Sequence, residues 1–345
     1  MAHFTEPSTS ASASHFHLVE DLGLEEEQAT WFARHRPELL HAPLDDGPST
    51  STNKATGRLT TRISGLADLL GCTTSQAAAM LQKQPALIDV DSGAIRRRLD
   101  GLVRAFGGID STAHEGTIRE ASEDAAGISQ QQLQLQAARQ LAARAARRVP
   151  VLLASDDHTS VGVPEHRLTM LRELLACEDA AEATRIAGQE PLLLVLEPSV
   201  VRARVEALQE LLDLAGGAQQ ATQLSRKHPW MMTVSSKSLE LKISAMSVSL
   251  GLPRKATLGI LVSYPPLLSL SERSVSTKVA MLSDHIPLDK LQAMVCMEPS
   301  LLARSTDKVL GSLKALREAI GKSTQNAIDL AERRPSILTR FVFMC

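Results

Sequence analysis

A proline followed, after one intervening residue, by two large apolar residues recurs eight times along this sequence. The first prolines of the eight phrases are Pro37, Pro85, Pro150, Pro191, Pro229, Pro265, Pro299 and Pro335. The gaps between them are 48, 65, 41, 38, 36, 34 and 36 residues. A recurring period of this size is typical of repeat proteins, in which each unit is one supersecondary element that packs on its neighbours.

The five most regular phrases are each followed by a predicted helix with one apolar face. Large apolar residues stand at the tenth, fourteenth, seventeenth and twenty-first positions after the proline. In the unit of Pro265 they are Val275, Val279, Leu282 and Ile286. Steps of four, three and four place these side chains on one helix face. Ser or Thr clusters before this helix and Gly often follows it, as helix caps require.

A second, shorter helix is predicted before each proline, as in residues 252–264, 287–298 and 324–334. Proline lacks an N–H group and disfavours helix at the preceding residue, so the short helix must end there. The aliphatic pair then fills the corner between the helices. Neither helix can bury its apolar face alone. The sequence therefore predicts an all-α superhelical solenoid of about eight repeats, each with two helices.

The repeats differ in regularity along the chain. We expect residues 1–14 to form a disordered Ser/Ala-rich tail. Residues 15–189 should hold irregular repeats with polar insertions at 41–57 and 107–127. Residues 190–345 should hold the regular repeats. The last of these is expected to be incomplete, because only ten residues follow Pro335.

Charge is distributed unevenly between the two halves. Residues 1–201 contain 18 Lys and Arg against 27 Asp and Glu, a balance of −9, and residues 202–345 contain 19 against 12, a balance of +7. A basic half favours a polyanionic partner.

Other features of composition restrict the possible functions further. Aromatic residues make up only 3% of the chain, which disfavours base stacking on aromatic rings. No apolar run approaches the length of a membrane span. Residues 1–14 lack Arg and carry Glu6, so they make a poor transit peptide.

A Pro-x-Leu-Leu corner between a short and a longer Ser/Thr-capped helix, repeated about every 35 residues, resembles the mitochondrial transcription termination factor (mTERF) family, in its plant and algal form. The resemblance runs from about residue 22 to the end and is sharpest from Pro191 to Leu338. It implies a curved superhelix with a short 3₁₀ turn in each repeat, and no enzymatic activity. It further implies a protein of mitochondria or chloroplasts that binds double-stranded DNA, as a monomer and without a cofactor.

Cations recur at one position of the repeat. The thirteenth residue after the proline is Arg98, Arg204, Lys242 or Lys278, and the series is interrupted at Ser312. This position lies about 70° from the centre of the apolar face, so these side chains could contact phosphates or could pack against the neighbouring repeat. Both interpretations remain open. Further candidate nucleic-acid-binding residues are Lys237, Arg273, Lys308, Lys314 and Arg317. The pairs Arg226–Lys227 and Arg333–Arg334 precede prolines, where cations also suit a helix C-terminus.

Signals for catalysis or metal binding are weak. The nearest approach to a metal cluster is Asp156, Asp157 and His158 with His166, and a polar loop explains these residues better. No phosphate-binding loop, dinucleotide fingerprint or hydrolase motif is present.

Three functions remain as alternatives. The first is a double-stranded DNA-binding regulator of organellar transcription, such as a termination factor. The second is an RNA-binding factor for organellar intron splicing or ribosome assembly, with structured RNA as its partner, and the third is a HEAT-like protein scaffold. No membrane partner is expected.

Overall fold

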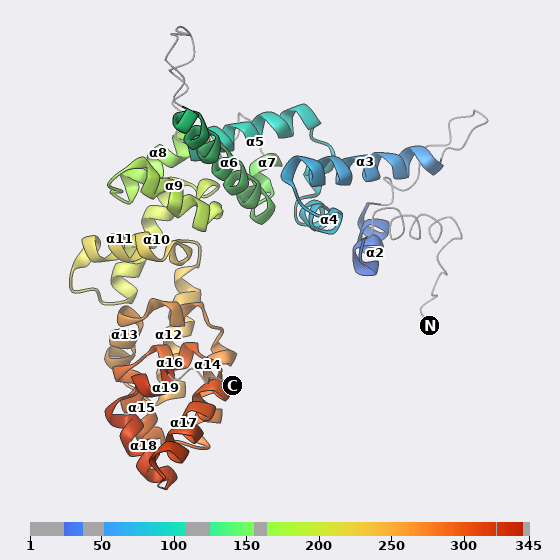
Figure 1. Ribbon diagram of the computed structural model, residues 1–345. Helices are drawn as coiled ribbons and strands as arrows, with labels where there is room; N and C mark the ends of the chain where they lie inside the picture. The colour runs from blue at the N-terminus through green and yellow to red at the C-terminus, as the bar shows by residue number, and fades with distance from the viewer. Residues whose placement is uncertain (1–23, 37–51, 108–124, 155–163, 322, 341–345) are drawn as a thin grey trace, which may run out of the picture. The chain divides into compact units, whose positions relative to one another are not determined.

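The computed structural model describes residues 24–36, 52–107, 125–154, 164–321 and 323–340. Within these ranges all the regular secondary structure is helical, as predicted for an all-α repeat solenoid. The chain divides into two compact units, residues 1–198 (unit 1) and residues 199–345 (unit 2). Figure 1 shows the helices in chain order.

Unit 1 contains the less regular repeats. Its elements are α2 (Glu26–His35), α3 (Thr52–Leu70), α4 (Thr74–Lys83), the 3₁₀ turn η2 (Pro85–Ile88), α5 (Ser92–Gly107), α6 (Ala125–Arg148), α7 (Val151–Ala154), α8 (Pro164–Leu174), α9 (Ala180–Gln189) and the 3₁₀ turn η4 (Pro191–Leu194). The tail at 1–14 and most of both predicted insertions lie outside the described residues. Residues 52–57 were expected in a loop but belong to α3, since they continue the apolar-faced helix at 59–70 and contain no proline.

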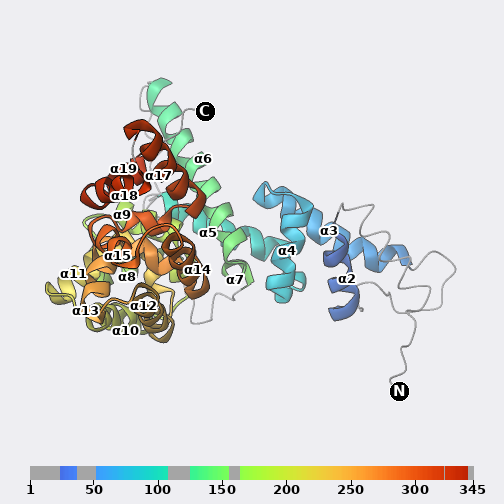
Figure 2. The same cartoon turned by 90° about the horizontal axis from the view of Figure 1, so that it is seen from below.

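Unit 2 contains the regular repeats. Its elements are α10 (Pro198–Leu211), α11 (Gly217–Lys227), η5 (Pro229–Met232), α12 (Ser236–Leu250), α13 (Arg254–Ser263), η6 (Pro265–Ser269), α14 (Glu272–Ser283), α15 (Leu288–Met297), α16 (Ser300–Ala303), α17 (Thr306–Ile320), α18 (Thr324–Arg333) and α19 (Ser336–Arg340). Helix α10 begins at the last residue of unit 1. In both overall views α17, α18 and α19 lie together (Figure 1, Figure 2).

Each regular repeat is a short helix, a tight turn that starts at the proline, and a long helix. The short helix α11 ends at Lys227, and the backbone of His228 leaves the helical region (φ −131°, ψ 69°) because it precedes Pro229. The following pair, Met231 and Met232, is fully buried in the corner, as predicted. The turns at Pro150, Pro299 and Pro335 are single turns of α-helix instead of 3₁₀ turns.

Some of the long helices have the Ser caps and Gly ends that the sequence predicts. The hydroxyl groups of Ser235 and Ser271 accept hydrogen bonds from backbone N–H groups three residues on, which caps α12 and α14. Gly251 and Gly321 follow α12 and α17 with φ of 61° and 59°, a conformation that favours glycine. The predicted apolar face is buried in all five regular repeats, except that Ile320 at the end of α17 is half-buried. No described helix is both long and apolar enough to cross a membrane.

Candidate nucleic-acid interface

The three cations at the thirteenth position of the repeats in unit 2 make equivalent contacts. We call Arg204, Lys242 and Lys278 the cation ladder. Arg204 Nη1 donates a hydrogen bond to the carbonyl oxygen of Met232 at 2.7 Å, and Lys242 Nζ donates one to that of Leu268 at 2.6 Å. Lys278 Nζ donates to the carbonyl oxygens of Leu302 (2.8 Å) and Arg304 (2.9 Å). In each case the cation of one repeat reaches the turn of the next.

The acceptors are also equivalent. Met232, Leu268 and Leu302 each stand three residues after the proline of their own turn. The last carbonyl groups of a helical turn have no hydrogen-bond donor within the turn and carry partial negative charge. A cation at this place supplies both a donor and a compensating positive charge. All three ladder side chains are half-buried. Burial lowers the pKa of the Lys278 ammonium group below its usual range.

Unit 1 repeats this contact with arginine. Arg98 stands at the same position of its repeat, and its Nη1 donates to the carbonyl oxygen of Leu153 at 2.7 Å, again three residues after a repeat proline. Arg62 Nε donates to the carbonyl oxygen of Ile88 at 3.2 Å, the equivalent acceptor in the turn at Pro85. Sequence reasoning did not single out Arg62, because an insertion changes its spacing from Pro37.

A second set of cations on the same helices has a different environment. We call Lys237 (α12), Arg273 (α14) and Lys308 (α17) the exposed row; each lies in the first turn of its long helix and is exposed. Among the described residues, their side chains form no hydrogen bond or ion pair. Lys314 and Arg317, farther along α17, are also exposed, and Arg317 lies 3.9 Å from Glu318. The structure therefore separates the predicted cations into a half-buried ladder and an exposed set.

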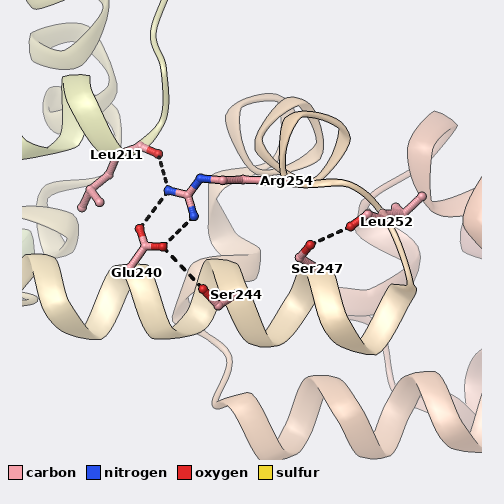
Figure 3. A network of polar contacts seen from close by, with 6 residues as sticks. All are labelled: Leu211, Glu240, Ser244, Ser247, Leu252 and Arg254. Carbon is pink, nitrogen blue, oxygen red and sulfur yellow. Dashed lines mark hydrogen bonds and ion pairs between the residues drawn. The ribbon is translucent and has the colours of Figure 1, made fainter.

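Arg254 at the start of α13 joins three repeats of unit 2 and was not predicted from the sequence (Figure 3). Its guanidinium group contacts both carboxylate oxygens of Glu240 on α12, at 2.6 and 2.8 Å. The same group donates to the carbonyl oxygen of Leu211 at the end of α10, at 3.5 Å. Ser244, on the next turn of α12, donates a hydrogen bond from its hydroxyl group to the Glu240 carboxylate. These hydrogen bonds to Arg254 lower the pKa of the Glu240 carboxyl group.

The residues beside the corner prolines have mixed roles. Arg226, Lys227 and Arg333 lie in the last turns of α11 and α18, at the helix ends where cations are favourable. His228 is half-buried, and burial followed by the charge of Lys227 lowers the pKa of its imidazole. Trp230 is half-buried in the turn η5.

A hollow of about 480 Å³ lies in unit 1 between α5, α8 and α9. Arg104 and Arg172 line it together with Glu165, and Arg104 pairs with Glu165 at 3.5 Å. Charges of both signs meet there, so the hollow favours no single class of ligand. Of the weak metal candidate, His166 is exposed and residues 155–158 lie outside the described ranges. Within those ranges, no three or more His, Cys, Asp or Glu side chains form a group that could hold a metal ion.

Comparison with known proteins identifies the family to which these repeats belong. No curated protein matches the sequence. The mTERF family model, however, matches residues 16–339, nearly the whole chain. This match agrees with the corner prolines, the paired helices and the repeat spacing, and the chain therefore belongs to the mTERF family.

Proposed function

We propose that this protein binds double-stranded DNA in a mitochondrion or chloroplast and regulates transcription there, with termination as the leading process. Membership of the mTERF family supports a nucleic-acid-binding role in organellar gene expression. The observation that carries the proposal is the exposed row. Exposed cations without a protein partner among the described residues recur at the start of three consecutive long helices.

The exposed row is suited to a regular polyanion. Phosphate groups recur along a duplex, and one cation from each successive repeat can neutralise one of them without reading the base sequence. The whole of unit 2 supports this role, since residues 199–345 hold 19 Lys and Arg against 12 Asp and Glu. We propose that one monomer binds the duplex, with unit 2 as the main contact surface.

The test replaces Lys237, Arg273 and Lys308 together by Gln in the full-length protein. Affinity for a DNA duplex is measured across a series of salt concentrations. Each lost phosphate contact removes about 0.9 from the slope of log affinity against log salt, so the slope should fall by up to about 2.7. A matched triple variant in unit 1, Arg96, Arg97 and Arg139 to Gln, removes the same charge from exposed positions and should leave the slope nearly unchanged.

Equal slopes for the two triple variants would refute the exposed row as the phosphate contact. Measuring a structured RNA and a single-stranded RNA in parallel identifies the nucleic acid. Tighter binding to structured RNA than to the DNA duplex would replace the proposal by a role in intron splicing or ribosome assembly. Absence of binding to all three would favour a protein scaffold. Weak binding to the single strand is expected, because the chain has few aromatic side chains for stacking.

A further inference from the structure

The cation ladder has a role that differs from nucleic-acid binding. We infer that Arg204, Lys242 and Lys278 are clamps between repeats, each of which joins the long helix of one repeat to the turn of the next. The inference rests on three equivalent contacts in consecutive repeats of unit 2. The role of the ladder as clamps does not depend on the proposed function. Only the assignment of the phosphate contacts to the exposed row rests on it.

The geometry explains why a cation stands at this position. The thirteenth residue lies on the flank of the buried face, so its aliphatic stem can cover the edge of the core while its charged end reaches the neighbouring turn. The carbonyl group three residues after the proline lies at or next to the end of that turn, where the backbone lacks helical partners. A hydrogen bond from a charged donor is among the stronger ones available to such a carbonyl.

The contacts in unit 1 show that the arrangement does not depend on one side chain or one spacing. Arg98 makes the same contact across a gap of 65 residues between repeat prolines, and Arg62 makes it across a gap of 48. The clamp is therefore kept where the insertions fall. Arginine and lysine both serve as donors, so an exchange between them should preserve it.

A clamp has a consequence for folding that a phosphate contact lacks. In a repeat protein, stability is the sum of terms within each repeat and coupling terms between neighbours. Loss of a clamp removes part of a coupling term, so the turn of the next repeat should open more often while the repeat that donates the cation stays intact. Loss of an exposed cation should have neither effect.

The experiment compares two double variants of the full-length protein on the same two helices, with no nucleic acid present. Lys242→Met and Lys278→Met remove two clamps while keeping the apolar stems. Lys237→Met and Arg273→Met remove the same charge from the exposed row. Hydrogen exchange is followed at the backbone amides of η6 and α16. We expect exchange there to be about tenfold or more faster in the clamp variant, and unchanged in the exposed variant.

Two further measurements make the result decisive. The variant Lys242→Arg and Lys278→Arg should restore slow exchange, as Arg98 and Arg204 already serve as clamps. If the double Met variant does not fold, single Lys278→Met is measured in its place. Exchange at η6 and α16 that equals that of the exposed variant would overturn the inference, as would failure of the Arg variant to restore it.

Binding to a DNA duplex then separates this inference from the proposed function. The clamp variant should keep the salt dependence of the parent protein, whereas the exposed variant should lose about 1.8 from the slope. A clamp variant that loses slope and keeps slow exchange would identify the ladder as the phosphate contact. If the exchange result holds but neither variant changes the slope, the clamps stand and the assignment of phosphate contacts to the exposed row fails.

Discussion

Units 1 and 2 are built from the same corner but with different spacing between the corners. The repeat prolines of unit 1 that the structure describes are separated by 65 and 41 residues, while the gaps from Pro229 to Pro335 are 34 to 36. Both units nevertheless bury the aliphatic pair after the proline, except that Ile337 in unit 2 is half-buried, and in both a cation from the preceding repeat contacts the turn. The different spacing therefore leaves the buried pair and the cation contact of the corner in place.

The largest effect is expected in the core that both units share. Leu102 on α5 and Leu282 on α14 occupy the seventeenth position after their prolines and are 0% and 1% exposed. Replacing either by Ala should lower the free energy of unfolding by about 2–5 kcal/mol, because each change leaves a cavity. Urea unfolding of the full-length protein measures the loss. Ser276→Ala, an exposed change on α14, should cost less than about 0.5 kcal/mol.

The outcome also tests the comparison between the units. If Leu102→Ala costs much less than Leu282→Ala, the repeats of unit 1 pack more loosely than their burial indicates. Similar costs would show that the insertions leave the core as stable as in the regular repeats.

The second effect concerns the charge difference between the units. Fragments of residues 1–189 and 190–345 separate the acidic half from the basic half. The second fragment should bind a DNA duplex about a hundredfold more tightly at moderate salt, with a steep salt dependence, because binding of phosphates requires cations. Circular dichroism confirms that each fragment is helical before binding is compared. Equal affinities would show that the charge difference is only a feature of surface composition.

A smaller effect is expected at the polar contacts that join repeats. Arg254→Met removes the contacts with Glu240 and with the carbonyl group of Leu211 (Figure 3). Since this ion pair is exposed, the free energy of unfolding should fall by about 1 kcal/mol or less. Lys255→Met, which changes the adjacent exposed cation, is the control. In unit 1, Arg147 Nη1 approaches the carbonyl oxygen of Gly71, beyond the end of α3, at 3.4 Å, and Arg147→Met should have an effect of similar size.

The pH dependence of this contact gives a second measurement. Arg254 holds the folded-state pKa of the Glu240 carboxyl group below its ordinary value. The contribution is therefore present above the unfolded pKa and is lost as the pH falls through the folded pKa. In the Arg254→Met protein that loss should be smaller. An unchanged acid dependence would show that the ion pair adds nothing to stability in solution.

The fold was predictable because its signals are local. Proline ends the short helix, the Ser caps and Gly ends mark the long helix, and the spacing of apolar residues identifies the buried face. The position of the ladder on the flank of that face was also predictable. Its partner was not, because the acceptor of Lys242 is a backbone carbonyl group 26 residues away, and any residue type would supply one. The contact of Arg254 with the backbone of Leu211, 43 residues away, was missed for the same reason, and its pairing with Glu240, 14 residues away on another helix, depends on how the two helices pack.

The smallest effect is expected at a residue before a corner proline, and two corners are compared. Before Pro191 in unit 1 this residue is Glu190, which pairs with Arg148 at 3.3 Å. Before Pro229 in unit 2 it is His228, whose folded-state pKa is lowered by burial and by the charge of Lys227. At pH 7.5 the imidazole is neutral in both the folded and the unfolded chain. As the pH falls below about 6.5 the unfolded chain binds the proton first, so the free energy of unfolding decreases.

Urea unfolding at pH 7.5 and pH 5.5 measures this decrease. It should be smaller in His228→Gln than in the parent protein, whereas His285→Gln, at an exposed site, should keep the full decrease. Equal decreases in all three proteins would show that the corner at Pro229 accepts a charged imidazole as readily as the corner at Pro191 accepts Glu190.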